Sequence, residues 1–159
     1  MAGERGIFDV PVKVKRGKAF TKPDLDELLR RLVLKAAYDV EARAKQRITD
    51  VGAVDTGSTR ASIYVRYGGR GGAPLGSYYG RLAEARAISP QTEFLDPGMP
   101  DVGDGHAALI GPSTNYAAYI EFGTVRMPAR PYMVPALEDV RGGFEAAVAA
   151  AITQLGNAP

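Results

Sequence analysis

Residues 115–138 read NYAAYIEFGTVRMPARPYMVPALE, and this stretch says most about the fold. It combines several aromatic residues with three prolines, Pro128, Pro131 and Pro135. Proline fixes φ and interrupts a helix interior, but it suits the first turn of a helix. The stretch therefore predicts a short apolar helix or bent strand at 116–122, a break at Gly123 and Thr124, a rigid proline-rich crossing, and entry into a last helix at Pro135.

The last helix is predicted to continue to about Leu155, because apolar residues follow Pro135 at three- and four-residue spacing. Gly142 and Gly143 weaken its middle. The aromatic residues that precede this helix are typical of a core, although tyrosine is also enriched at subunit interfaces. They are Tyr116, Tyr119, Phe122 and Tyr132.

Two charges stand among these apolar residues, and each has two interpretations. Glu121 lies between Ile120 and Phe122, and Arg130 lies next to Pro131. A buried charge needs a partner. Glu121 and Arg130 therefore either pair with each other, within a subunit or across a subunit boundary, or both face solvent.

A long amphipathic helix is predicted from about Pro23 to about Thr49. Thr21 precedes a proline and several acidic residues, which is typical of a helix start. Apolar residues then recur at helical spacing, with most basic residues on the other face. A helix of this length extends about 40 Å, so we expect it to lie across a whole sheet.

The remaining chain predicts a small antiparallel sheet. Asp55, Thr56 and Gly57 form a turn signal, residues 62–67 a strand, and residues 107–111 the returning strand. Residues 68–105 are rich in glycine and proline, so we expect a long insertion loop with a short helical piece at 81–88. Residues 1–20 suggest an extended arm or an edge strand, because Val10, Val12 and Val14 alternate with polar residues around Pro11.

Composition narrows the class of protein. A chain of 159 residues is most simply one domain, residues 1–159, and its net charge of +2 makes no electrostatic argument for nucleic acid. It has no cysteine, which excludes disulfides and thiolate chemistry. No apolar run is long enough to span a membrane, and the N-terminus lacks the core of a signal peptide. We therefore expect a protein that is made and used in a cytoplasm.

The sequence offers no convincing catalytic or metal-binding constellation. His106 is the sole histidine, and with Asp96, Asp101 and Asp104 it fits a solvated loop better than a metal site. The Asp55-Thr56-Gly57 triplet resembles that of aspartic proteases, but a second triplet is missing. We predict no enzymatic activity and no cofactor. The segment from Arg66 to Gly72 resembles an RGG tract and leaves a nucleic-acid-binding module open.

Two elements resemble one known family. The first is the Asp55-Thr56-Gly57 turn followed by Ser62 and Ile63, and the second lies within 116–138. The second element matches at Tyr116, Ala117, Tyr119, Glu121, Phe122, Gly123, Thr124, Ala129, Arg130, Pro131, Tyr132, Pro135, Ala136, Leu137 and Glu138. Together they are similar to the tail-completion or head–tail connector (neck) proteins of tailed phages, which are often called minor capsid proteins. The chain departs from the family pattern at Ser58 and Thr59, where family members usually have arginine and an aliphatic residue.

The resemblance extends over roughly residues 22–155 and implies an α+β fold, with the long helix packed on an antiparallel sheet and a C-terminal helix. It implies a structural virion protein without catalysis, present in the phage neck or tail and in the host cytoplasm during assembly. The implied partners are copies of the chain in a closed ring such as a hexamer, the connector or adaptor, and the tail terminator or tail-tube proteins.

Contact with genomic DNA follows only as an extension of this resemblance. Arg66, Arg70 and Arg81 are the candidates to face DNA inside such a ring. The alternative function is a small nucleic-acid-binding module that uses the glycine- and arginine-rich loop and the basic face of the long helix. Neither implies contact with a membrane.

Overall fold

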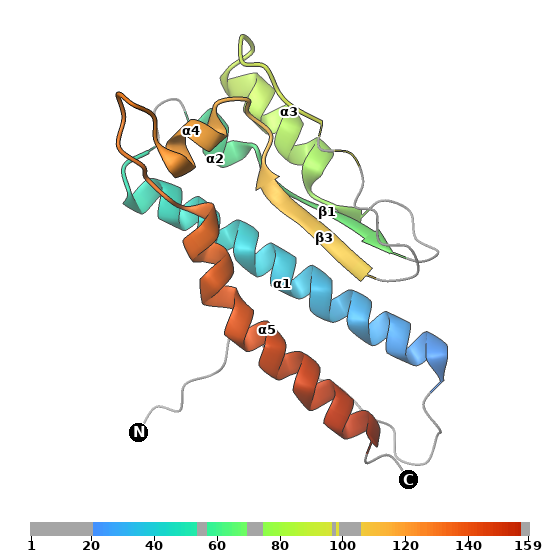
Figure 1. Ribbon diagram of the computed structural model, residues 1–159. Helices are drawn as coiled ribbons and strands as arrows, with labels where there is room; N and C mark the ends of the chain where they lie inside the picture. Colours follow the sequence, from blue (N-terminus) through green and yellow to red (C-terminus); the bar gives the residue numbers. More distant parts are fainter. Residues whose placement is uncertain (1–20, 54–56, 70–74, 97, 99–105, 157–159) are drawn as a thin grey trace.

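The computed structural model describes residues 21–53, 57–69, 75–96, 98 and 106–156. The fold is α+β, as predicted, with a long N-terminal helix, an antiparallel sheet and a C-terminal helix (Figure 1). Its elements, in chain order, are α1 (Lys22–Asp50), α2 (Ser58–Ala61), β1 (Ile63–Gly69), β2 (Leu75–Gly76), α3 (Tyr78–Ile88), β3 (His106–Pro112), α4 (Ala117–Phe122) and α5 (Met133–Gly156).

Helix α1 confirms the strongest prediction from the sequence. At its start, the Thr21 backbone N–H and hydroxyl both donate to the Asp24 carboxylate, at 3.1 and 2.7 Å. This arrangement satisfies a backbone donor outside the helix and fixes its first turn. At its end, the Val51 N–H donates to the Arg47 carbonyl, and Gly52 takes a left-handed φ of 63° that stops the helix.

The sheet has the strand order β2-β1-β3, and both pairings are antiparallel. In the longer pairing, Ile63 of β1 lies opposite Pro112 of β3, and the register continues to Gly69 opposite His106. The prediction that 107–111 returns antiparallel to 62–67 is therefore confirmed. Gly76 of β2 approaches β1 so closely that a Cβ there would lie 2.0 Å from the Val65 carbonyl oxygen.

Strand β1 is buried on both faces because helices cover each side of it. Ile63 packs with α1 residues in the main core cluster. On the opposite face the Tyr64 ring meets the Tyr78 ring of α3 edge-on, with 5.0 Å between centroids. This alternation follows the two-residue period of a strand. The layers run α3, sheet, α1, α5 (Figure 1).

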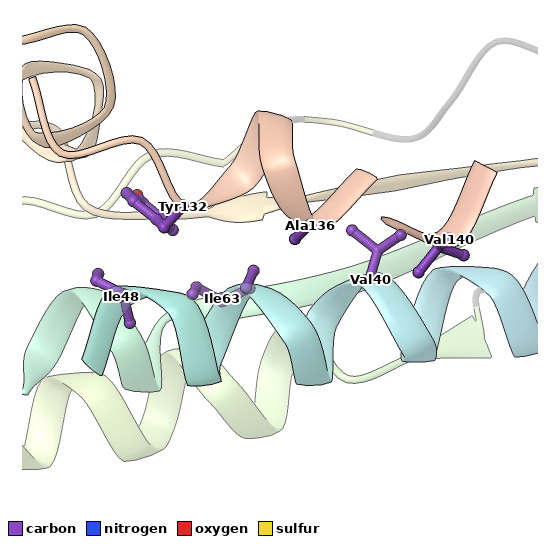
Figure 2. Packing of buried hydrophobic residues seen from close by; sticks show 7 residues of the cluster. Val40, Ile48, Ile63, Tyr132, Ala136 and Val140 are labelled. Atoms are coloured by element: carbon purple, nitrogen blue, oxygen red, sulfur yellow. The ribbon is translucent and has the colours of Figure 1, made fainter. Parts of the chain in front are cut away.

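Helix α5 runs antiparallel to α1, and two apolar clusters join them (Figure 1). In Figure 2, Tyr132, Ala136 and Val140 lie against Val40 and Ile48, with Ile63 of β1 behind them. A second cluster joins the other ends of the helices, and its buried members are Leu28, Leu32 and Ala151. Truncating one of the large aliphatic residues in such a core costs about 2–5 kcal/mol.

The expectation for residues 68–105 needs correction. Instead of one long insertion loop, this part of the chain carries the end of β1, strand β2 and the three-turn helix α3, which starts before the expected residue 81. Phe94 also forms a β-bridge with Thr114. The predicted helical pieces at 116–122 and after Pro135 are present, although α5 begins two residues earlier and continues through Gly142.

Two expectations lie outside the described residues: the arm or edge strand at 1–20 and the structure of Asp55 and Thr56. Within the described helices, none is both long and apolar enough to cross a membrane.

Candidate assembly surface

The carboxylate of Glu121 holds the start of α5. It accepts three backbone N–H groups, from Tyr132 at 2.8 Å, Met133 at 2.9 Å and Val134 at 2.9 Å. These donors lie at and just before the first turn of α5, where no carbonyl of the helix itself can accept them. The negative charge also lies at the positive end of the helix dipole. Glu121 is only 6% exposed, so it is a buried cap that locks α4 onto α5.

The sequence left open whether Glu121 and Arg130 pair with each other or both face solvent, and the structure gives each of them a different partner. Within the described chain they do not pair with each other. The Arg130 Nη1 donates instead to the Gly52 carbonyl, at 3.0 Å, and the Arg130 backbone N–H donates to the Ile120 carbonyl, at 2.8 Å. Arg130 therefore ties the proline-rich crossing to the C-terminal end of α1, and its side chain stays exposed.

Gly123 and Thr124 form a tight turn between α4 and the crossing. Gly123 has φ of 76°, and a Cβ there would lie 2.7 Å from the Ala129 backbone nitrogen. The Thr124 N–H donates to the Met127 carbonyl, at 2.8 Å, and its hydroxyl accepts the Met127 N–H, at 3.1 Å. Only glycine fits the first position without strain.

The aromatic residues of this stretch divide between core and surface. Tyr132 is fully buried between α1 and α5, and its burial raises the pKa of the phenol. Tyr119 is 59% exposed, Phe122 is 74% exposed, and Val125 on the turn is fully exposed. We call Tyr119, Phe122 and Val125 the apolar ridge. Tyr119 and Phe122 lie three positions apart on α4 and so share one face of that helix, and exposed apolar groups that gather on a surface are typical of an interaction site.

Hydroxyl groups pack the turn that follows residue 57, which sequence reasoning missed. Gly57 has φ of 84°, and Ser58, Thr59 and Ser62 after it are buried. The Ser62 hydroxyl donates to the Thr59 carbonyl at 2.9 Å, and the Thr59 and Thr114 hydroxyls are 3.3 Å apart. Thr59, where the chain departs from the family pattern, therefore has a polar partner that leucine could not bind.

Of the three arginines that were candidates to face DNA, the structure describes Arg66 and Arg81, and an acid binds each of them. Arg66 is 7% exposed and is bound to Asp96 at 2.5 Å, with its guanidinium 4.7 Å from the centroid of the Tyr78 ring. This placement contradicts the expectation that Arg66 faces DNA, because a buried, paired guanidinium cannot reach a phosphate. Arg70 lies outside the described residues.

Arg81, the third candidate for a DNA contact, binds a buried acid on α1. Glu41 of α1 is 3% exposed and accepts Arg81 Nε at 2.7 Å, Lys45 Nζ at 2.7 Å and the Ser77 hydroxyl at 3.0 Å. These contacts hold α3 on α1. The signal in the sequence is an acid beside the apolar residues Val40 and Ala44, which a helical projection places near the buried face.

The basic residues of α1 are also paired with acids. Every arginine and lysine between residues 24 and 50 lies within 4.0 Å of a carboxylate, some on α1 itself and some on other elements. Arg47, for example, bonds Asp139 of α5 at 2.6 Å. A polyanion would have to displace these partners, which weakens the nucleic-acid alternative.

The environment of His106 differs from the solvated loop that the sequence suggested. His106 begins β3 with a largely buried side chain. Its Nδ1 is 2.5 Å from the Tyr67 hydroxyl and its Nε2 is 3.7 Å from Asp26 of α1. Asp96 bonds Arg66, and Asp101 and Asp104 lie outside the described residues. In the described part of the chain, no three histidine, aspartate or glutamate side chains gather as a metal site.

A groove of about 610 Å³ lies between α1, α2 and α3. Its lining includes the cations Lys45, Arg60 and Arg81 and the acids Asp50 and Glu84. The groove therefore presents mixed charge without an activated nucleophile among its described residues.

No protein-family model matches the chain, and neither a curated protein nor a solved structure gives a significant match. The geometry of the chain's own residues must therefore carry the functional argument.

Proposed function

We propose that the chain is a structural subunit of the neck of a tailed bacteriophage. It completes the tail or joins the tail to the DNA-filled head as one member of a closed ring. Its partners in this proposal are further copies of the chain, the connector or adaptor on the head side, and the tail terminator or tail-tube proteins on the tail side.

The observation that carries the proposal is the contrast within residues 115–138. Glu121, Gly123 and Tyr132 are committed to fixing the backbone of α4, the turn and α5. Tyr119, Phe122 and Val125 are held on this rigid frame yet project into solvent. A rigid frame lowers the entropy lost on association, and exposed aromatic groups supply apolar area to bury.

A ring follows if the apolar ridge of one copy contacts a different surface of the next copy. Such a head-to-tail contact repeats around an axis until it closes. The resemblance of residues 55–63 and 116–138 to phage neck proteins supports this arrangement over a lone binding module. The ion pairs along α1 agree with this arrangement, since binding through protein contacts does not need free basic side chains.

The test is complementation of a phage that lacks this gene. Supplied in trans, the double variant Phe122→Ser and Val125→Ser is expected to leave the plaque titre near that of the knock-out. The matched control is Ile152→Ser, because Ile152 is 61% exposed but lies at the far end of α5. Circular dichroism and thermal unfolding must first confirm that both variants fold. Full restoration of the titre by the double variant would remove the ridge from the proposal.

A further inference from the structure

The sheet ends at β3 with an open edge. Strand β3 pairs with β1 along its whole length, and no described strand pairs with its other side. Its sequence, HAALIGP, carries no lysine or acid and has proline only at its last position. An open edge exposes backbone N–H and C=O groups, and natural proteins usually protect it with charge, proline, a bulge or a covering segment. The described edge of β3 therefore lacks protection by lysine or acidic side chains along its seven residues.

The chain itself supplies a segment at the correct end of this edge. Residues 1–20 precede Thr21, the N-cap of α1. Helix α1 starts beside the first residue of β3, since Asp26 Oδ1 lies 3.7 Å from His106 Nε2. A segment that leads into Thr21 from along β3 would run opposite to β3, which is the direction an antiparallel sheet needs.

The sequence of this segment suits an edge strand. Residues 8–14 read FDVPVKV, with apolar residues at every second position. Pro11 cannot donate to a ladder, which restricts such a strand to the edge of a sheet. The six residues 15–20 connect it to Thr21 and can extend up to about 20 Å, enough to step from the helix layer to the sheet layer.

We propose that residues 8–14 bind the open edge of β3 in the same chain, as a fourth and antiparallel strand. The pairing that matches the pleat sets Val10 opposite Ile110 and Val12 opposite Ala108. Ile110 packs against the core cluster of α1 and α5, so the valines extend that apolar face while Asp9 and Lys13 point the other way. This strand shields the edge from association with unrelated chains and is independent of the proposed function.

The test uses the absence of cysteine from the chain. Val12→Cys combined with Ala108→Cys places two thiols across the proposed pair. The matched control combines Val12→Cys with Ala118→Cys, because Ala118 is exposed on α4 at the opposite end of β3. In dilute protein under mild oxidation, we expect the first pair to close roughly tenfold faster than the control, since paired strands bring Cβ atoms to about 5 Å.

Non-reducing electrophoresis and peptide mass spectrometry give three outcomes. A disulfide within one chain supports the proposal. A disulfide between two chains overturns it and assigns the edge to a neighbouring copy. Closure no faster than in the control also overturns it.

A second measurement needs no cysteine. Deleting residues 1–15 is expected to raise amide hydrogen exchange at alternate residues of β3 and to leave the exchange of α5 unchanged. Unchanged exchange along β3 would contradict the pairing.

Discussion

Glu121→Ala is expected to destabilise the fold strongly. The variant removes the acceptor of three N–H groups at the start of α5. The Tyr132 N–H belongs to a buried residue, and an unpaired buried donor costs about 1–3 kcal/mol. Met133 and Val134 are partly open to water, so each of their donors costs less, about 0.5–1 kcal/mol.

The sum is about 3 kcal/mol, with loss of the favourable charge at the helix dipole included in that figure. For a chain of this size the expected fall in Tm is about 6–12 °C. Glu121→Gln keeps one acceptor oxygen and should lose about half as much. The control is Glu138→Ala, because Glu138 is exposed on α5 and lies 3.6 Å from Arg141, a contact that contributes at most about 0.5 kcal/mol.

Urea unfolding followed by circular dichroism measures all three variants. The cap account requires the order Glu121→Ala, then Glu121→Gln, then Glu138→Ala, from most to least destabilised. A loss below about 1 kcal/mol for Glu121→Ala would refute it, because the three N–H groups would then be satisfied equally well by water.

Three further predictions concern other parts of the fold. Gly76→Ala should lower the free energy of unfolding by more than about 3 kcal/mol, because Gly76 has φ of 135° and the new methyl group would meet the Val65 carbonyl. The control is Gly80→Ala in α3, which has open space around it and should raise the free energy of unfolding by about 0.5–1 kcal/mol. Equal effects of the two substitutions in chemical unfolding would contradict this prediction. Hydrogen bonds from Arg30 and Arg31 lower the pKa of Glu27 to about 2, so its contribution is complete above its unfolded pKa near 4.5 and disappears as the pH falls towards 2. Because Glu27 is 41% exposed, solvent screening reduces that contribution to about 0.5–1 kcal/mol, and Glu27→Gln should abolish that part of the pH dependence of unfolding. Arg66→Gln should lower the free energy of unfolding by about 1–3 kcal/mol, because the guanidinium packing on the Tyr78 ring is lost. The same variant should leave DNA retention in phage particles unchanged. A loss of DNA retention without a loss of stability would instead identify Arg66 as a DNA contact.

The periodic parts of the fold were predictable because their signals are local. The apolar stripe of α1, the alternating residues of β1 and the proline before the main body of α5 each follow from the geometry of one element. The pairing of β1 with β3 could be predicted because each strand is a short apolar run in the sequence and a single region of turns and loops separates the two runs.

The region 68–105 was misjudged because glycine and proline dominated its composition. The helix α3 carries only moderate periodicity, and it is held by contacts with distant residues, such as Arg81 with Glu41 and Tyr78 with Tyr64. Such contacts depend on tertiary packing, which a local window cannot contain. The same holds for Arg66, whose partner Asp96 lies thirty positions later in the chain.

The candidate surface was predictable only in part. The sequence located residues 116–138 but left the roles of its aromatic residues open. Tyr132 and Phe122 look alike in sequence, yet Tyr132 is buried in the core while Phe122 is 74% exposed, a difference that tertiary packing sets.

The most direct test of the proposed function is electron microscopy of lysates from the phage that lacks this gene. The account predicts DNA-filled heads beside complete but unattached tails, and rescue of joined particles by the intact gene. Normal, infectious particles in the absence of the gene would contradict it.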